Sequence, residues 1–138
     1  MKLYKILIVL IAMICLTACQ STEFQYDLNE LKSEVISVEI VNAYYDSNNL
    51  LVIDVVRTIN QVDIEELLID FSKIQFTILI GNPQITNGDA LKINYVDGYE
   101  IVSNNSILKY NFIDESMTQD DIYTPKEFED FILKWKQE

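Results

Sequence analysis

The chain contains three turn sequences that are too short to join parallel strands. They are Asp-Ser-Asn-Asn at 46–49, Asp-Gly at 97–98 and Asn-Asn at 104–105, and each separates two strand-like runs. A parallel connection needs about a dozen residues or more, whereas an antiparallel hairpin closes in about two to five. Gly98 suits a hairpin because glycine adopts positive φ without steric cost. The chain is therefore predicted to form an antiparallel sheet.

Segments rich in β-branched and aromatic residues are predicted to be strands. They lie at 35–45, 50–59, 75–80, 90–96, 99–103 and 106–113. The segment 50–59 is apolar on both faces except at Asp54, a pattern typical of a central strand that is covered on both sides. The polar, acidic stretch 114–121 is predicted to be a loop.

Helical periodicity marks the remaining ordered segments. A short helix is expected at 28–35, and apolar residues at 3.6-residue spacing predict amphipathic helices at 60–73 and 124–136. Asn60 and Thr124 are the expected N-caps of the two amphipathic helices. The predicted fold class is α+β, an antiparallel sheet of about five to six strands with the two amphipathic helices packed on one face.

The N-terminus has the pattern of an export signal. Two lysines precede an unbroken apolar run, residues 6–16, which is too short for a membrane-spanning helix of about 20 residues. The block Leu16-Thr17-Ala18-Cys19 resembles the lipobox of bacterial lipoproteins. The isoleucine-rich and asparagine-rich composition resembles that of small lipoproteins from low-GC Gram-positive bacteria.

The resemblance implies that residues 1–18 are a cleaved signal peptide and that Cys19 carries a lipid. Residues 19–26 are then the lipidated cysteine and a short tether, and 27–138 form a single α+β domain. An ordinary secretory signal or an uncleaved anchor is the alternative, and either would also export the domain. The expected location is extracytoplasmic, attached to the cell membrane through Cys19.

Charge narrows the choice of partners. Without residues 1–18 the chain carries 8 basic and 22 acidic side chains, a formal net charge of −14. Nucleic acid is excluded as a partner because its binding needs clustered lysine and arginine, and an anionic membrane would repel the domain. The charge would suit a cationic partner, but solubility of an envelope protein is the favoured explanation of the charge.

The composition excludes most common kinds of catalytic site. The chain has no histidine, and with Cys19 lipidated and Cys15 cleaved off, the domain has no thiol for catalysis, zinc or a disulfide. Its three glycines have no phosphate-loop spacing. We therefore expect no catalytic residue, no metal and no cofactor.

Two weak motifs in the sequence suggest chemistry that this expectation leaves out. Ser106 and Lys109 match the S-x-x-K pattern of β-lactamases, but residues three apart on a strand face opposite sides and no K-T-G motif follows. The carboxylates of 114–121 lack the alternation and central glycine of a calcium loop, so a solvated acidic loop is favoured. Asp54 is the acid of most interest, because it could belong to a carboxylate pair. The favoured alternative is that Asp54 faces solvent or pairs with Arg57 or a lysine.

Tyrosines on the predicted strands suggest a binding surface, because they offer large contact area with few rotatable bonds. The candidate residues are Tyr44, Tyr45, Asp54, Tyr95, Tyr99 and Tyr110. Cross-strand packing of these side chains is the structural alternative. The leading hypothesis is a non-enzymatic protein-interaction module of immunity or inhibitor type. The alternatives are a binder of a small ligand or envelope polymer in a pocket between sheet and helices, and a carboxylate-based hydrolase.

Overall fold

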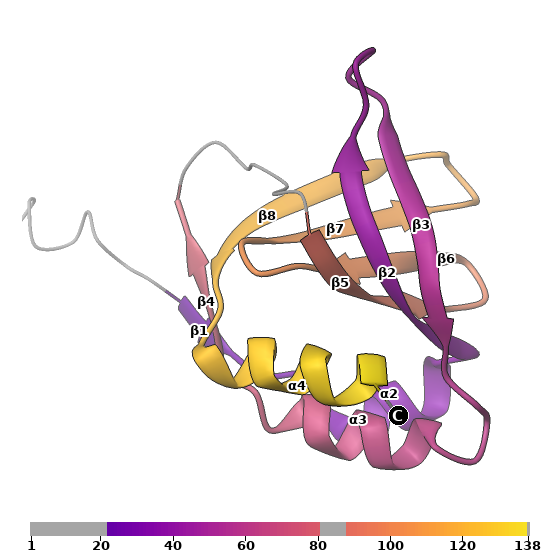
Figure 1. The fold of residues 1–138 in the computed structure, drawn as a ribbon, viewed down its shortest axis with the longest axis vertical. Coiled ribbons are helices and arrows are strands. Elements are labelled where there is room, and N and C mark those ends of the chain that lie inside the picture. Colours follow the sequence, from indigo (N-terminus) through magenta and orange to yellow (C-terminus); the bar gives the residue numbers. More distant parts are fainter. Residues whose placement is uncertain (1–21, 81–87, 138) are drawn as a thin grey trace, which may run out of the picture.

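The computed structural model describes residues 22–80 and 88–137, which form three helices and eight strands (Figure 1). The predicted signal peptide and Cys19 lie outside these residues. In chain order the elements are β1 (Thr22–Phe24), α2 (Leu28–Glu34), β2 (Ser37–Tyr45), β3 (Leu51–Thr58), α3 (Ile64–Ser72), β4 (Phe76–Leu79), β5 (Gly88–Asn94), β6 (Gly98–Val102), β7 (Ser106–Asn111), β8 (Met117–Tyr123) and α4 (Lys126–Gln137).

The described strands form one antiparallel sheet in the order β1-β4-β8-β7-β6-β5-β2-β3. This confirms the predicted α+β class and antiparallel sheet. The six predicted strands correspond to β2 through β7. The expectation of five to six strands is wrong, because the sheet has eight.

The two strands that were not predicted lie in polar segments. β1 lies in the expected tether and pairs with β4, with Phe24 opposite Phe76. β8 lies in the expected acidic loop and pairs with β7 on one side and β4 on the other. Only Ile122 of β8 is fully buried, so backbone hydrogen bonding to two neighbours, rather than apolar patterning, makes this segment a strand.

The prediction that 50–59 is a central, covered strand is also wrong. β3 is the last strand of the sheet, and Asp54, Val55 and Val56 on it are exposed. The pairing of β2 with β3 shifts register between Ile40, opposite Arg57, and the next residue of β2, opposite Val55. A bulge of this kind interrupts the alternation of faces, which explains why the apolar pattern looked two-sided.

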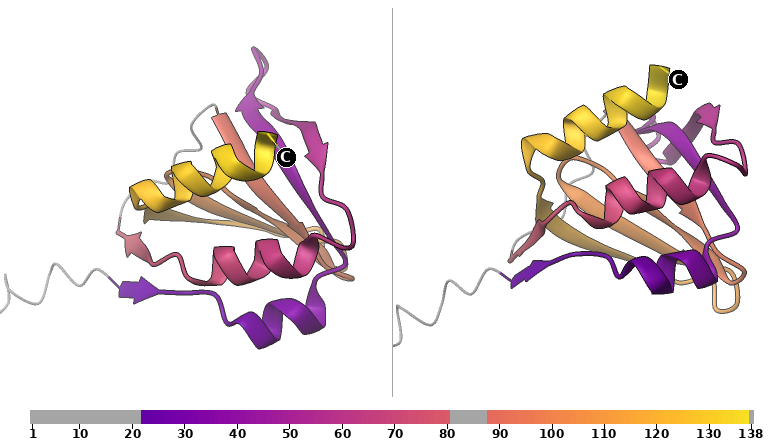
Figure 2. Two further views of the ribbon diagram at one scale, coloured as in Figure 1. Left: turned by 60° about the horizontal axis from the view of Figure 1, so that its bottom comes forward. Right: turned by 90° about the horizontal axis from the view of Figure 1, so that it is seen from below.

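The helices cover one face of the sheet (Figure 2). The main core joins the apolar stripes of α3 and α4 to inward-facing residues of β2, β4, β5 and β8. Phe71 of α3 and Phe131 of α4 meet with ring centroids 5.7 Å apart, and Phe76 of β4 contacts Phe71 and Phe128. The prediction that the amphipathic helices pack on one face is confirmed.

Neither Asn60 nor Thr124 is the N-cap of its helix, so both predicted N-caps are wrong. Asp27 caps α2 by accepting a 2.9 Å hydrogen bond from the backbone N–H of Glu30. The N-cap of α3 is Asp63 rather than Asn60, and α4 starts at Lys126. Thr124 instead donates its hydroxyl to the backbone carbonyl of residue 104, at 2.6 Å.

Gly98 begins β6 at the predicted hairpin, but positive φ is not the reason for glycine there. None of the described glycines has positive φ. A Cβ atom on Gly98 would lie 1.9 Å from the carbonyl oxygen of Tyr110 on β7. The close approach of two backbones is what requires glycine at this position.

Candidate functional site

A cavity of about 410 Å³, which we call the acidic pocket, lies between α2 and the strands that α2 faces. Phe24, Tyr26 and Tyr95 give it aromatic walls. Six carboxylates line it but only one cation, Lys109. The carboxylates are those of Asp27, Glu30, Glu34, Asp97, Glu100 and Asp120. The volume is in the usual range for a ligand pocket, and the charge of its lining is strongly negative.

Glu100 of β6 is a carboxylate of the acidic pocket that has both a hydrogen-bond donor and an ion-pair partner. The hydroxyl of Tyr26 donates to its Oε2 at 2.8 Å, and Lys109 Nζ lies 3.1 Å from its Oε1. The side chain of Glu100 is only 14 % exposed. Burial and the neighbouring charge of Glu100 raise the pKa of Tyr26 well above its usual value. Tyr26 therefore stays protonated and keeps its role as donor.

The carboxylates of the acidic pocket other than Glu100 make its electrostatic potential negative. Burial raises the pKa of Tyr95, and the charges of Glu100, Glu34 and Glu30 raise it further. No ion pair within residues 22–80 and 88–137 involves Glu30, Glu34 or Asp97. A positively charged group entering the pocket would meet carboxylates that are not already neutralised.

A second hollow of about 300 Å³ adjoins the acidic pocket and shares four of its residues, including Tyr95 and Asp97. Tyr99 and Tyr110 line the second hollow. Their rings stack with centroids 5.4 Å apart, and Phe112 packs edge-on against both at 6.0 and 5.8 Å. Tyr99 and Tyr110 pack against a second buried cluster on the other face of the sheet, whereas Tyr95 packs against the main core.

Large apolar side chains are exposed at these strand ends. Val96 lies in the β5–β6 turn, while Phe112, Ile113 and Met117 surround the β7–β8 turn. The two turns are joined, because the N–H of Phe112 donates to the carbonyl of Asp97 at 2.7 Å. We call these four exposed residues the tip. Figures 1 and 2 place the two turns at one end of the molecule and β1 at the other.

The tyrosines and the acid predicted as a surface are divided among separate places. Tyr95 lines the acidic pocket, and Tyr99 and Tyr110 line the adjoining hollow. The remaining three candidates, Tyr44, Tyr45 and Asp54, lie on the β2–β3 hairpin. A hydrogen bond to exposed Asp54 raises the pKa of Tyr44. Asp54 is therefore not a buried acid, and no buried carboxylate pair forms around it.

Tyr26, Glu100 and the apolar residues of the tip were not predicted from the sequence, because only the fold brings them together. Tyr26 is the last residue of the expected tether, and Glu100 is one acid in a short strand, so neither carries a local signal. The apolar residues of the tip are also locally unremarkable, since single exposed apolar side chains are common. The Asp-Gly turn at 97–98 was the sequence signal nearest to this site, because a hairpin turn marks an end of the sheet, where other loops also lie.

The weak motifs do not form sites. Ser106 is buried with its hydroxyl 2.9 Å from that of Ser103, while Lys109 pairs with Glu100. This agrees with the expectation that the two residues of the S-x-x-K match face opposite sides. In the part of the chain that the structure describes, no group of carboxylates is placed to hold a metal ion. Asp114 accepts from the N–H of Ser116 at 3.0 Å.

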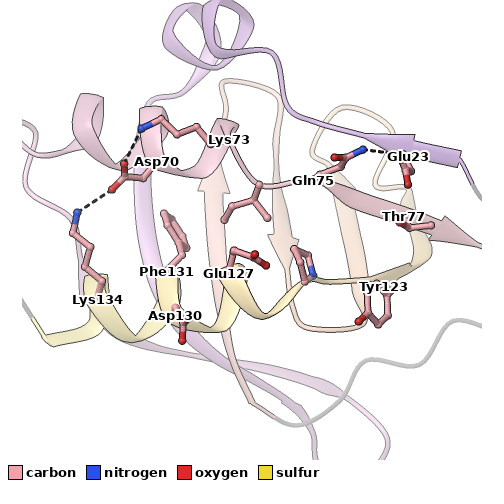
Figure 3. A pocket seen from close by; sticks show the side chains of 12 residues that line it. Glu23, Asp70, Lys73, Gln75, Thr77, Tyr123, Glu127, Asp130, Phe131 and Lys134 are labelled. Carbon is pink, nitrogen blue, oxygen red and sulfur yellow. Dashed lines mark hydrogen bonds and ion pairs between the residues drawn. The ribbon is translucent and has the colours of Figure 1, made fainter.

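Another cavity, of about 720 Å³, lies between α3, α4 and β4 and is a weaker candidate (Figure 3). Three of its charged groups pair with one another, because Lys134 Nζ and Lys73 Nζ lie 2.9 and 3.4 Å from carboxylate oxygens of Asp70. The hydrogen bond from Lys134 lowers the pKa of Asp70, and the same bond raises the pKa of Lys134. Gln75 similarly donates to Glu23 at 2.6 Å.

Comparison with protein-family models, with curated proteins and with solved structures finds no match. Among the helices of the described residues, none is long and apolar enough to cross a membrane. The candidate site therefore rests on geometry and charge alone.

Proposed function

We propose that the protein is an extracytoplasmic lipoprotein, anchored through Cys19, that binds another protein and catalyses no reaction. The lipobox resemblance and the preceding apolar run support the anchor. The docking surface is the tip together with the adjoining acidic pocket. The single observation that carries the docking proposal is the exposed tip lying beside carboxylates without ion-pair partners.

The composition of this surface matches that of protein interfaces. Interface centres are rich in aromatic residues and methionine and are surrounded by polar groups. Here Phe112 and Met117 lie beside the Tyr99–Tyr110 stack on the sheet face away from the helices. The acidic pocket lies on the helix face and reaches the same strand ends at Asp97 of the β5–β6 turn. Exposed apolar side chains gathered beside a pocket mark interaction sites more often than scattered ones do.

The charge of the pocket defines the partner as cationic. A lysine or arginine side chain from the partner would enter beside Tyr26 and Tyr95, whose ring faces attract cations. It would pair with Glu30, Glu34 or Asp120, which lie at the same pocket. A basic exported toxin or enzyme, neutralised at the cell surface, fits this surface and the immunity-type or inhibitor-type role.

Affinity capture with paired charge variants tests the proposal. The full-length lipoprotein in detergent is used to capture proteins from envelope extract, at low and at high salt. The pocket variant removes three charges from the acidic pocket, and the control removes three from α4. The pocket substitutions are Glu30→Gln, Glu34→Gln and Asp120→Asn. The control substitutions are Glu127→Gln, Glu129→Gln and Asp130→Asn.

The expected result is one basic protein retained by the unmodified chain and by the α4 control. The pocket variant should retain it at least about tenfold less, and salt should weaken capture because it screens exposed charges. Equal loss in both variants would show a net-charge effect rather than a site. Repeated absence of any retained basic protein would contradict the proposal.

The volume of the acidic pocket favours one second candidate, a small cationic ligand. At about 410 Å³ it has room for a ligand, and its lining combines aromatic walls with six carboxylates and one lysine. A linear polyamine is a suitable probe. Saturable calorimetric binding of the polyamine, abolished by the pocket substitutions and kept by the α4 control, would support this candidate over a protein partner.

A further inference from the structure

We propose that the end of the domain opposite the tip rests on the membrane, through the exposed apolar side chains Leu79, Ile80 and Tyr123. This inference relies on the lipid anchor of the proposed function but not on its protein partner. The occupant of this surface is the lipid bilayer, at the level of the headgroups. The domain then stands end-on, with the tip directed away from the lipid.

Covalent geometry limits the distance between the anchor and this end. Two residues separate Cys19 from Thr22, the first residue of β1. Three steps between consecutive Cα atoms span at most about 11 Å. A lipid on Cys19 therefore keeps the start of β1 within about 11 Å of the lipidated residue, a distance similar to the depth of the polar headgroup layer.

The sheet register places the apolar side chains beside the start of β1. Thr22 is paired with Ile78 of β4, so Leu79 and Ile80 are the next residues along the neighbouring strand. Adjacent strands are about 4.8 Å apart. Tyr123 of β8 lies opposite Thr77 of β4, whose other partner is Glu23 of β1. All three side chains thus lie within two strands of the anchored segment.

All three side chains are accessible at the surface, and Tyr123 also lines the cavity between α3, α4 and β4. Ile80 is 86 % exposed, Tyr123 is 64 % exposed and Leu79 is 44 % exposed. Ile78 and Ile122 are paired and point into the main core beneath the helices. Because side chains alternate along a strand, their neighbours Leu79 and Tyr123 lie on the opposite face of the sheet. Tyrosine is enriched at membrane–water interfaces, where its ring is buried and its hydroxyl stays hydrated.

The end-on arrangement also agrees with the charge of the domain. A net charge of −14 opposes any orientation that presses a broad acidic surface against an anionic bilayer. Contact limited to the end that carries Leu79 and Ile80 keeps most of the acidic surface away from the bilayer, although Glu23 and Asp121 lie on the neighbouring strands. Figures 1 and 2 show β1 and β4 at one end and the β5–β6 and β7–β8 turns at the other. The tip is then presented to partners outside the membrane.

Site-specific labelling of the full-length lipoprotein tests this orientation. The lipidated chain has no other thiol once Cys15 is removed and Cys19 is acylated, so one introduced cysteine is labelled uniquely. An environment-sensitive fluorophore is attached at Ile80→Cys or at Ile113→Cys. The two sites are matched, since both are isoleucines on the surface, 86 % and 81 % exposed. The protein is reconstituted in phosphatidylcholine–phosphatidylglycerol vesicles with nitroxide-labelled headgroups.

The label at position 80 should be quenched by the nitroxide lipid at least about twofold more than the label at position 113, with a blue-shifted emission. Equal quenching at both positions, or stronger quenching at position 113, would overturn the orientation. A mass spectrum showing no lipid on Cys19 would overturn it as well. Capture of a basic protein through the tip does not depend on these outcomes, so failure of the orientation and failure of the docking proposal are distinguishable.

Discussion

The hydroxyl of Tyr26 donates a 2.8 Å hydrogen bond to the carboxylate of Glu100, which lies 74 residues away on β6. The contact joins the segment that precedes α2 to the middle of the sheet and forms one wall of the acidic pocket. Tyr26 also packs on Phe71 of α3, with ring centroids 4.7 Å apart. One side chain thus connects the pocket to the main core.

Removing the hydroxyl of Tyr26 should destabilise the fold measurably. Tyr26→Phe keeps the ring contacts but removes a hydrogen bond to a charged acceptor, so we expect the free energy of unfolding to fall by about 1–3 kcal/mol. Urea unfolding followed by circular dichroism measures it. Tyr44→Phe is the control, because its partner Asp54 is exposed and its loss should cost less than about 0.5 kcal/mol. Equal effects of the two substitutions would contradict the role of Tyr26.

The domain should lose stability in alkaline solution, above about pH 10. The pKa values of Tyr26 and Tyr95 are raised in the folded chain, mainly by burial. Above pH 10 the unfolded chain therefore releases protons that the folded chain still holds, so unfolding becomes more favourable as the pH rises toward the folded pKa values. Below pH 10 the contribution of both tyrosines is fully present.

Unfolding free energies at pH 8, 10 and 11 measure this effect. The double variant Tyr26→Phe, Tyr95→Phe should lose less stability over this range than the unmodified domain does. Absorbance at 295 nm should show that these two tyrosines ionise last. An unchanged slope in the double variant would assign the alkaline loss to other groups.

Gly98 should not accept a side chain. A Cβ atom there would lie 1.9 Å from the carbonyl oxygen of Tyr110, so Gly98→Ala forces β6 and β7 apart. We expect a loss of about 1–3 kcal/mol, together with a disturbed Tyr99–Tyr110 stack. Gly88→Ala is the matched control, because no atom lies within 4 Å of the Cβ added there. Thermal unfolding compares the two variants, and similar midpoints would contradict the steric argument.

Local patterns predicted the elements that are determined locally. The helices 60–73 and 124–136 and the hairpin at 97–98 follow from apolar period and turn chemistry within a few residues, and α3, α4 and the β5–β6 hairpin confirm them. Their exact starts were less predictable. Asn60 and Thr124 are residue types that often cap helices. However, α3 starts at Ile64 and α4 at Lys126, so both residues lie too far before the first helical residue to be its N-cap.

The remaining features depend on contacts that are distant in sequence. β8 is polar, and it is a strand because β4 and β7 flank it. β1 is a strand because its backbone pairs with that of β4. The acidic pocket draws on both of these strands, on α2 and on β6, so its geometry could not be deduced from sequence. Tyr95, Tyr99 and Tyr110 were recognisable only as tyrosines near turns.

Photo-crosslinking in intact cells tests the central claim most directly. A photoreactive amino acid replaces Ile113 in the tip or, as control, Val62 in the segment before α3, two sites that are 81 % and 86 % exposed. We predict an adduct with one basic exported protein at position 113 and none at position 62, and the adduct should weaken when Glu30, Glu34 and Asp120 are neutralised. No adduct at position 113, or an equally strong adduct at position 62, would contradict the claim that the tip and the acidic pocket form the docking surface.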